Sequence, residues 1–200
     1  MSIPSEDEQW RDEHQQASHQ RLVLLCRPAV PETYRYLLRV RICAGSGPHL
    51  AIIGKNPSQA DAVRADPTTG KAEAWARRQG FSTLTYVNLF AYRSSYPKTL
   101  NALEPAQAVG PDNDASICEA VRAATAVVAA WGNPNGIDRV RYDGRIRVVL
   151  ALIRDVSNSG QGRDLSCLFV VGHLTDQGYP RHPLHWNLEP ALRSWLAATS

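Results

Sequence analysis

Residues 50–58 read Leu50-Ala51-Ile52-Ile53-Gly54-Lys55-Asn56-Pro57-Ser58, a short apolar run that passes directly into a polar loop. Such a run, bounded by glycine and proline, is typical of a buried strand. Downstream, residues 71–79 place apolar side chains on one helical face and end at Gly80, and residues 84–87 form a second apolar run. Strand, helix and strand in this order predict a βαβ unit and therefore a parallel sheet.

The rest of the chain continues this alternation. Further strands are expected at 126–131 and 165–171, and further helical stretches at 97–103, 112–123, 138–156 and 189–198. Upstream, an apolar run at 21–26 and alternating residues at 34–42 predict an extra N-terminal strand or hairpin. We therefore expect an α/β fold of three αβα layers around a central four-stranded, mostly parallel sheet. It would occupy residues 21–200 as one domain, behind a tail or helix at 1–20.

Two other strands of the predicted sheet are also followed by short polar segments. Asn88 directly follows the strand at 84–87, and His182 lies in the loop Pro180-Arg181-His182-Pro183-Leu184 that follows the last apolar run. Because parallel strands send their following loops to one edge of the sheet, we expect Asn56, Asn88 and His182 to meet in one pocket.

Composition restricts the class of protein but does not select a function. The 200 residues are 44% hydrophobic and 20% charged, which is typical of a soluble globular protein. A net charge of +3 permits nucleic acid as a partner without arguing for it. No apolar run approaches the roughly 20 residues that span a bilayer, and residues 1–20 do not resemble a signal peptide, so a cytoplasmic protein is expected. The four cysteines stand singly, which gives no metal-cluster framework and no reason to expect a cofactor.

The two asparagines suit recognition of a small ligand. Asn56 is held between the flexible Gly54 and the rigid Pro57, and its amide can hold a water or a carbonyl. Equally, it can serve only to satisfy backbone groups of the loop or to cap a helix. Asn88 offers a donor and an acceptor together, as needed to read the edge of a nucleobase. Phe90 and Tyr92 could stack on that base, although packing in the core is the more common use of such residues. Arg93, which follows them, could reach a phosphate or remain solvated.

His182 lies between Pro180 and Pro183, which stiffen the loop around the imidazole. A neutral imidazole can donate a hydrogen bond to a developing oxyanion, and we expect Arg181 beside it to favour the neutral form. His185 could pair with His182 on a metal, but no third ligand accompanies them, so no metal site is predicted.

Two carboxylates follow Asn56. Asp66 precedes Pro67 and Thr68, a pattern that favours a helix cap, and it is also the first candidate if the chemistry needs a carboxylate. Asp61 is the second candidate. The chain lacks a P-loop, a GxGxxG turn and a GxSxG elbow, which excludes the commonest readings as a nucleotide triphosphatase, a dinucleotide enzyme or a serine hydrolase.

Several of these signatures together closely resemble a bacterial and phage family known as domain of unknown function 1643. The segments that carry the resemblance are 34–37, 56–61, 66–68, 87–90, 110–114, 130–132 and 178–184. It covers about residues 34–186, most of the chain.

The order strand-GxNP, strand-Asn, strand-Gly, strand-His-Pro is also similar to that of the uracil-DNA glycosylase superfamily, whose fold is a four-stranded parallel sheet with helices on both faces. This distant resemblance implies that Asn56 positions the attacking water, Asn88 reads the base and His182 steadies the oxygen of the departing base. Leu184 stands where serine is usual, and no aspartate occupies the position that activates water in the most powerful uracil enzymes.

The reaction implied is hydrolysis of the N-glycosidic bond of a damaged, mismatched or modified base in DNA, in repair or in phage defence. DNA and a flipped nucleobase would then be the partners. Leu184 or Trp186 would fill the gap left in the duplex. The remaining expected DNA contacts are Lys55, Ser58, Arg93, Lys98 and Arg181.

Two alternatives remain open. One is an N-glycosidase that acts on a free nucleoside or nucleotide, which would show turnover without salt-sensitive DNA affinity. The other is a non-catalytic module that binds a modified base and releases no product. A purely structural protein is the least favoured, because polar strand ends and a stiff histidine loop would then serve no purpose.

Overall fold

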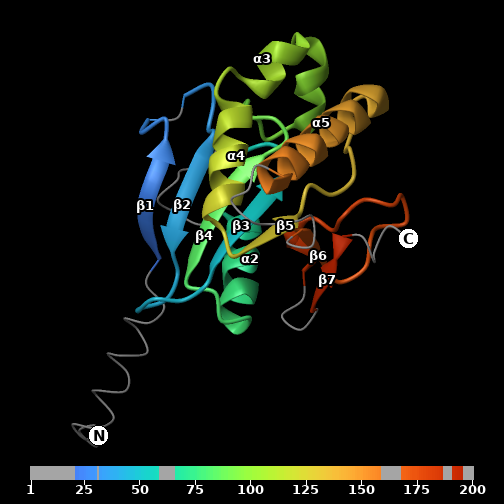
Figure 1. The fold of residues 1–200 in the computed structure, drawn as a ribbon. Coiled ribbons are helices and arrows are strands. Elements are labelled where there is room, and N and C mark those ends of the chain that lie inside the picture. Colours follow the sequence, from blue (N-terminus) through green and yellow to red (C-terminus); the bar gives the residue numbers. More distant parts are fainter. Residues whose placement is uncertain (1–20, 31, 59–65, 159–167, 187–190, 196–200) are drawn as a thin grey trace, which may run out of the picture.

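The computed structural model describes residues 21–30, 32–58, 66–158, 168–186 and 191–195. Within them, a seven-stranded mixed sheet has the strand order β1-β2-β4-β3-β5-β6-β7 (Figure 1). The strands are β1 (Leu22–Arg27), β2 (Leu37–Arg41), β3 (His49–Gly54), β4 (Thr83–Asn88), β5 (Ala126–Ala129), β6 (Leu168–Val171) and β7 (Leu192–Ser194).

The centre of the sheet is parallel and its edges are antiparallel. Strands β4, β3, β5 and β6 pair in parallel, with Gly54 at the end of β3 beside Asn88 at the end of β4. The β1–β2 pair adds antiparallel to β4, and β7 adds antiparallel to β6. The predicted α/β class and the N-terminal hairpin are therefore confirmed, and the sheet is wider than expected.

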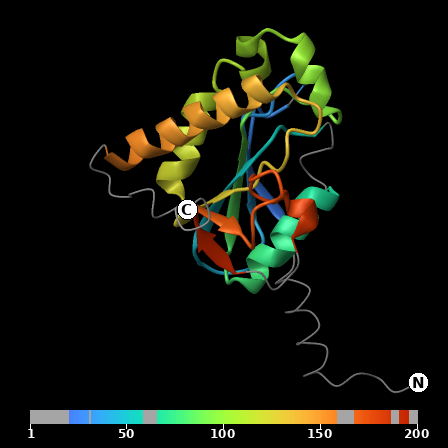
Figure 2. The same cartoon turned by 90° about the vertical axis from the view of Figure 1, so that its right-hand side faces the viewer.

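Helices cover both faces of this sheet (Figures 1 and 2). On one face α2 (Pro67–Arg78) lies beside the short helix η3 (Pro183–His185). On the other face lie α4 (Asn113–Ala123) and α5 (Arg139–Asn158), near the connection formed by η1 (Pro97–Ala102) and α3 (Pro105–Val109). The α3 helix was not predicted, although Glu104 and Gln107 form a capping box at its start.

Each face of the sheet has its own apolar core. The α4 and α5 face buries Leu37, Ile53, Val87, Trp131 and Tyr142 among others. The α2 face buries Ile52, Trp75, Val128 and Trp186 among others. Successive residues of β3 thus lie in the two cores in turn, as expected of a central strand covered by helices on both sides.

The C-terminal end differs from the sequence prediction. The helix expected at 189–198 is wrong for 192–194, because Leu192, Arg193 and Ser194 form β7 against β6. This pairing supplies hydrogen-bond partners to a strand that would otherwise lie at the sheet edge. The tail or helix expected at 1–20, the second candidate carboxylate Asp61 and one of the four cysteines, Cys167, lie outside the described residues. No helix in the described ranges is long and apolar enough to cross a membrane.

Candidate active site

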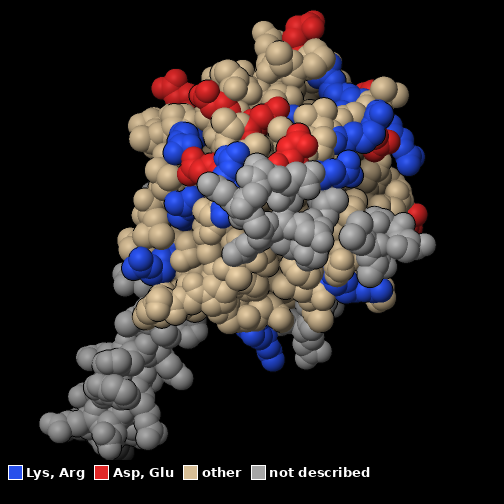
Figure 3. Space-filling model, in the orientation of Figure 1, with Lys and Arg blue, Asp and Glu red and all other residues tan. Residues whose placement is uncertain are grey.

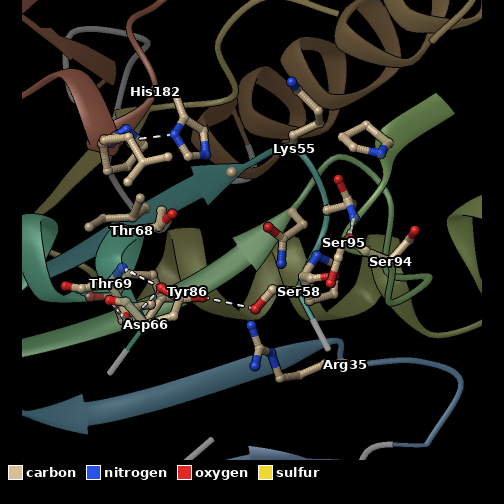
Figure 4. A pocket seen from close by; sticks show the side chains of 18 of the residues that line it. Arg35, Lys55, Ser58, Asp66, Thr68, Thr69, Tyr86, Ser94, Ser95 and His182 are labelled. Carbon is tan, nitrogen blue, oxygen red and sulfur yellow. Dashed lines mark hydrogen bonds between the residues drawn. The ribbon is translucent and has the colours of Figure 1, made fainter. Parts of the chain in front are cut away.

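A pocket of about 340 Å³ opens at the carboxyl ends of β3 and β4. Asn56, Asn88 and His182 all line it, together with the first turn of α2. Figure 4 labels His182 and, in that turn, Thr68 and Thr69. The expected meeting of these three side chains is therefore found, although Asn56 and His182 lie far apart in the sequence. The parallel pairing of β3 with β4 brings the first two together, and the loop after β6 carries the third.

Gly54 makes room for Asn88. A Cβ atom on Gly54 would lie 2.7 Å from Asn88 Oδ1, closer than real Cβ contacts. The Asn88 residue is 8% exposed, and none of the described residues forms a hydrogen bond with its side-chain amide. Its main chain is fixed, because the buried Asn113 amide donates to the carbonyls of Asn88 and Leu89, at 3.1 Å each. The result is a rigidly placed amide that is available to a ligand.

The Asn56 side chain is anchored through its nitrogen. Asn56 Nδ2 donates to the carbonyl oxygens of Ser94 at 2.7 Å and Pro57 at 3.2 Å. Both amide hydrogens are therefore committed, and Oδ1 is the atom left to accept a hydrogen bond. That polarity suits a residue that holds a water molecule.

His182 is held as a neutral donor. Its Nδ1 accepts a hydrogen bond from the Leu184 backbone N–H at 3.3 Å, which places the proton of the neutral ring on Nε2. Nε2 is turned towards the pocket (Figure 4). Burial, and then the nearby charge of Lys55, lower the pKa of His182 to about 4. Gly132 allows this placement, because a Cβ there would lie 2.9 Å from His182 Cβ.

Lys55 is the cation that acts on His182. The lysine residue is 5% exposed, and its Nζ lies 6.0 Å from the centre of the Tyr142 ring. Burial lowers the pKa of Lys55 to about 8, so the ammonium remains mostly charged at neutral pH. Lys55 has no ion pair with any described residue. The role expected of Arg181 thus falls to Lys55, because Arg181 Nε donates to the His173 carbonyl at 3.1 Å and the side chain lines a separate hollow.

Asp66 caps α2, as the pattern of Asp66 before Pro67 and Thr68 predicted. Its Oδ1 accepts from the Thr69 N–H at 2.8 Å, and its Oδ2 accepts from the Ser58 hydroxyl at 2.8 Å. Burial alone would raise the pKa of Asp66, but these hydrogen bonds, with the charge of Arg35, hold it below its usual value. Asp66 lines the pocket as an ionised group, and both of its oxygens are already used.

Arg35 also lines the pocket, and the sequence prediction missed it. It precedes β2 and is 7% exposed. Its alternating neighbours, Tyr34 and Tyr36, suggested a half-exposed strand and gave no sign that this arginine would be buried at a site.

Both predicted stacking residues lie elsewhere. Phe90 is buried in the core against Tyr142, with ring centres 6.4 Å apart, and Tyr92 packs edge-on against Tyr34. Neither lines the pocket, because the chain turns away after Asn88 and carries them under α4 and α5. Among the described residues, Tyr86 is the tyrosine that does line it, two residues before Asn88 on the same face of β4.

The expected DNA contacts divide into two groups. Lys55, Ser58 and Leu184 line the pocket, and Leu184 is 38% exposed. Trp186 does not fit the expected wedge, because it is 5% exposed and packs on Trp75 with ring centres 5.0 Å apart.

The predicted cations outside the pocket have other neighbours. Arg93 donates to the carbonyls of Ser58 and Glu32, both at 3.3 Å, and Lys98 is exposed beside Gly136. On the face in Figure 3, basic and acidic side chains are interspersed and form no continuous basic stripe. Among the described residues, no three histidine, cysteine, aspartate or glutamate side chains gather as a metal site would require.

Comparison with known proteins identifies a family but no characterised relative. Neither the comparison with curated proteins nor that with solved structures gives a significant match. A family model described as a protein of unknown function, DUF1643, matches residues 35–184, which include every pocket side chain discussed above. The chain therefore belongs to the DUF1643 family.

Proposed function

We propose that this protein hydrolyses the N-glycosidic bond of a damaged, mismatched or modified nucleobase in DNA. The observation that carries the proposal is that one pocket contains both a neutral His182 and the Asn88 amide. That amide forms no hydrogen bond with any described residue. Asn88 would bind the edge of the base, and His182 would donate from Nε2 to a base oxygen on which negative charge develops. A donor that is already neutral and aligned does not have to reorganise as the bond breaks.

The water would be held by Asn56. Because the Asn56 amide nitrogen is committed to the Ser94 carbonyl, Oδ1 would accept from a water beside C1′ of the sugar. The C1′–N bond breaks with its electron pair passing to the base, the water oxygen adds to C1′, and the water proton leaves to solvent. Asp66 is too fully hydrogen-bonded to act as a strong base, but its negative charge favours the cationic sugar. These features suit a dissociative reaction in which water attacks late.

With Trp186 buried, Leu184 is the remaining candidate among the pocket side chains for the wedge that enters the duplex. Its carbonyl accepts from Lys71 Nζ at 2.6 Å, and its N–H is held by His182. An exposed apolar side chain on a braced backbone could replace a flipped base in the stack. The biological setting that we propose is base repair or defence against phages with modified DNA.

A second candidate is the same reaction on a free nucleotide. The observation that favours it is the placement of Arg93 and Arg181, which donate to carbonyls of the protein itself rather than facing the pocket. Fewer cations at the mouth mean a weaker hold on a DNA backbone.

The test is direct detection of released base. The full chain is incubated with plain and phage-hypermodified genomic DNAs and with a panel of nucleotides, and free bases are identified by mass spectrometry. We expect a released base that disappears in His182→Ala and Asn56→Ala and persists in His173→Ala, an exposed histidine outside the pocket. Release from nucleotides alone would select the second candidate. Binding of a base without release would refute catalysis and leave a non-catalytic binding module.

A further inference from the structure

Arg35 is a buried cation at the border of the pocket. It lies on the side of the pocket opposite His182 and Lys55, with its guanidinium beside Ser58 (Figure 4). Its backbone N–H donates to the Ala91 carbonyl at 3.0 Å, which fixes the base of the side chain. The charged end is therefore directed into the pocket from a rigid position.

The guanidinium has no hydrogen bond or ion pair with any described residue. Other arginines of low exposure are paired: Arg145 bonds the Leu89 carbonyl at 2.6 Å and also Asp114, and Arg21 bonds Glu73 at 2.8 Å. Burying a charge without a partner is costly, so buried arginines are normally satisfied. Arg35 departs from that pattern within the same fold.

The charges around Arg35 do not neutralise it. Burial, followed by the charge of Arg93, lowers the pKa of Arg35, and Arg21 acts in the same direction. Cys26 and Asp66 act in the opposite direction, but both oxygens of Asp66 already accept from Ser58 and Thr69. This side of the pocket therefore keeps an excess of positive charge that an incoming anion would balance.

The geometry points to a phosphate, and we propose that Arg35 binds the phosphate of the nucleotide whose base is held by Asn88 and His182. A guanidinium presents a planar fork of N–H donors that matches two phosphate oxygens. The proposal rests on the proposed function for the nucleotide, but the phosphate site itself requires no reaction. The phosphate belongs either to a free 5′-nucleotide, as a monoester, or to a DNA strand, as a diester.

Binding of small phosphates tests the site without any catalysis. Inorganic phosphate and 2-deoxyribose 5-phosphate are titrated into the full chain by calorimetry, with uncharged 2-deoxyribose as the matched ligand. We expect the phosphates to bind and 2-deoxyribose to bind at least about tenfold more weakly, since hydrogen bonds to charged groups contribute on this scale. Equal binding of 2-deoxyribose 5-phosphate and 2-deoxyribose would overturn the proposal. This result needs only the natural chain and does not depend on the folding of any variant.

Variants then locate the site. We expect Arg35→Gln to weaken phosphate binding about tenfold or more, Arg35→Lys to recover part of it, and Arg78→Gln, an exposed arginine on α2, to leave it unchanged. A thermal melt confirms that each variant is folded. Unchanged phosphate affinity in folded Arg35→Gln would refute the assignment.

The two sources of phosphate are separated by esterification. Thymidine 5′-monophosphate is compared with its methyl ester and with a thymidine trinucleotide. Arg35-dependent preference for the monoester supports a free nucleotide, and equal or better binding of the diesters supports a DNA strand. Arg35-dependent binding without base release would refute the proposed hydrolysis alone, whereas base release without Arg35-dependent phosphate binding would refute the phosphate site alone.

Discussion

Replacing Gly54 with alanine tests whether the pocket depends on the close approach of β3 to the Asn88 side chain. The new Cβ would lie 2.7 Å from Asn88 Oδ1, which is 0.7 Å short of the 3.4 Å at which ordinary contact begins. Either the amide or the strand must move. Overpacking of this kind costs about 1–3 kcal/mol, and the loss of glycine flexibility returns about 0.5–1 kcal/mol. We therefore expect Gly54→Ala to lower the free energy of unfolding by about 1–2 kcal/mol.

A second substitution identifies the cause. In Asn88→Ala both side-chain atoms that lie near the new methyl group, Oδ1 and Cγ, are absent, and the remaining neighbour, the Val87 carbonyl oxygen, lies at 3.9 Å. Adding Gly54→Ala to this background should be neutral or stabilising. The change in the free energy of unfolding caused by Gly54→Ala should thus differ by about 2 kcal/mol between the natural and the Asn88→Ala backgrounds. Residues in contact show coupling energies of this size.

Urea denaturation of the four proteins in this cycle measures the coupling. Gly70→Ala is the matched control, because a Cβ at Gly70 in α2 meets no atom within 4 Å, and alanine favours a helix by about 1 kcal/mol. An equal cost of Gly54→Ala in both backgrounds would refute the reasoning, as would a stabilised Gly54→Ala single variant.

Three further predictions concern charges and a cap. The pKa of His182 is about 4, against the ordinary 6.5, so the unfolded chain takes up a proton first as the pH falls. His182 therefore leaves the free energy of unfolding unchanged above pH 6.5 and lowers it by about 3 kcal/mol by pH 4. Unfolding measured at pH 7 and pH 4 should therefore show a smaller loss in His182→Gln, and an equal loss would contradict the assignment. Lys55→Met should raise the His182 pKa, which NMR of the imidazole can follow, and an unmoved pKa would leave burial and the neighbouring His185 as the causes that lower it. Asp66→Ala removes the cap of α2 and should cost about 1 kcal/mol in urea denaturation, whereas unchanged stability would show that the cap is dispensable.

Much of the fold could be predicted because local sequence and global topology agree. The apolar run of β3, the helical spacing of α2 and the apolar run of β4 each specify one element, and parallel connection follows from their order. The C-terminal residues were misread because Leu192 to Ser194 carry a pattern that suits either element. Pairing with β6 decides for a strand, and such a long-range contact leaves no local signal.

The site was predictable where residue type and strand end coincide. Asn56, Asn88 and His182 each stand in a polar signature after an apolar run, and the topology brings them together. The environment of each side chain was not predictable. Arg35 looks like a strand arginine in sequence, and its burial depends on how the chain crosses the pocket before entering β2.

The contact between Trp75 and Trp186 gives the protein a built-in optical reporter. Trp75 belongs to the helix that Asp66 caps, and Trp186 ends the loop that carries His182, so one indole lies on each of two segments that border the pocket. Trp186 Nε1 also donates to the Arg181 carbonyl at 3.0 Å, which ties the ring to the histidine loop. Any displacement of that loop changes the surroundings of this pair, and the fluorescence of the unlabelled chain then reports on the state of the site.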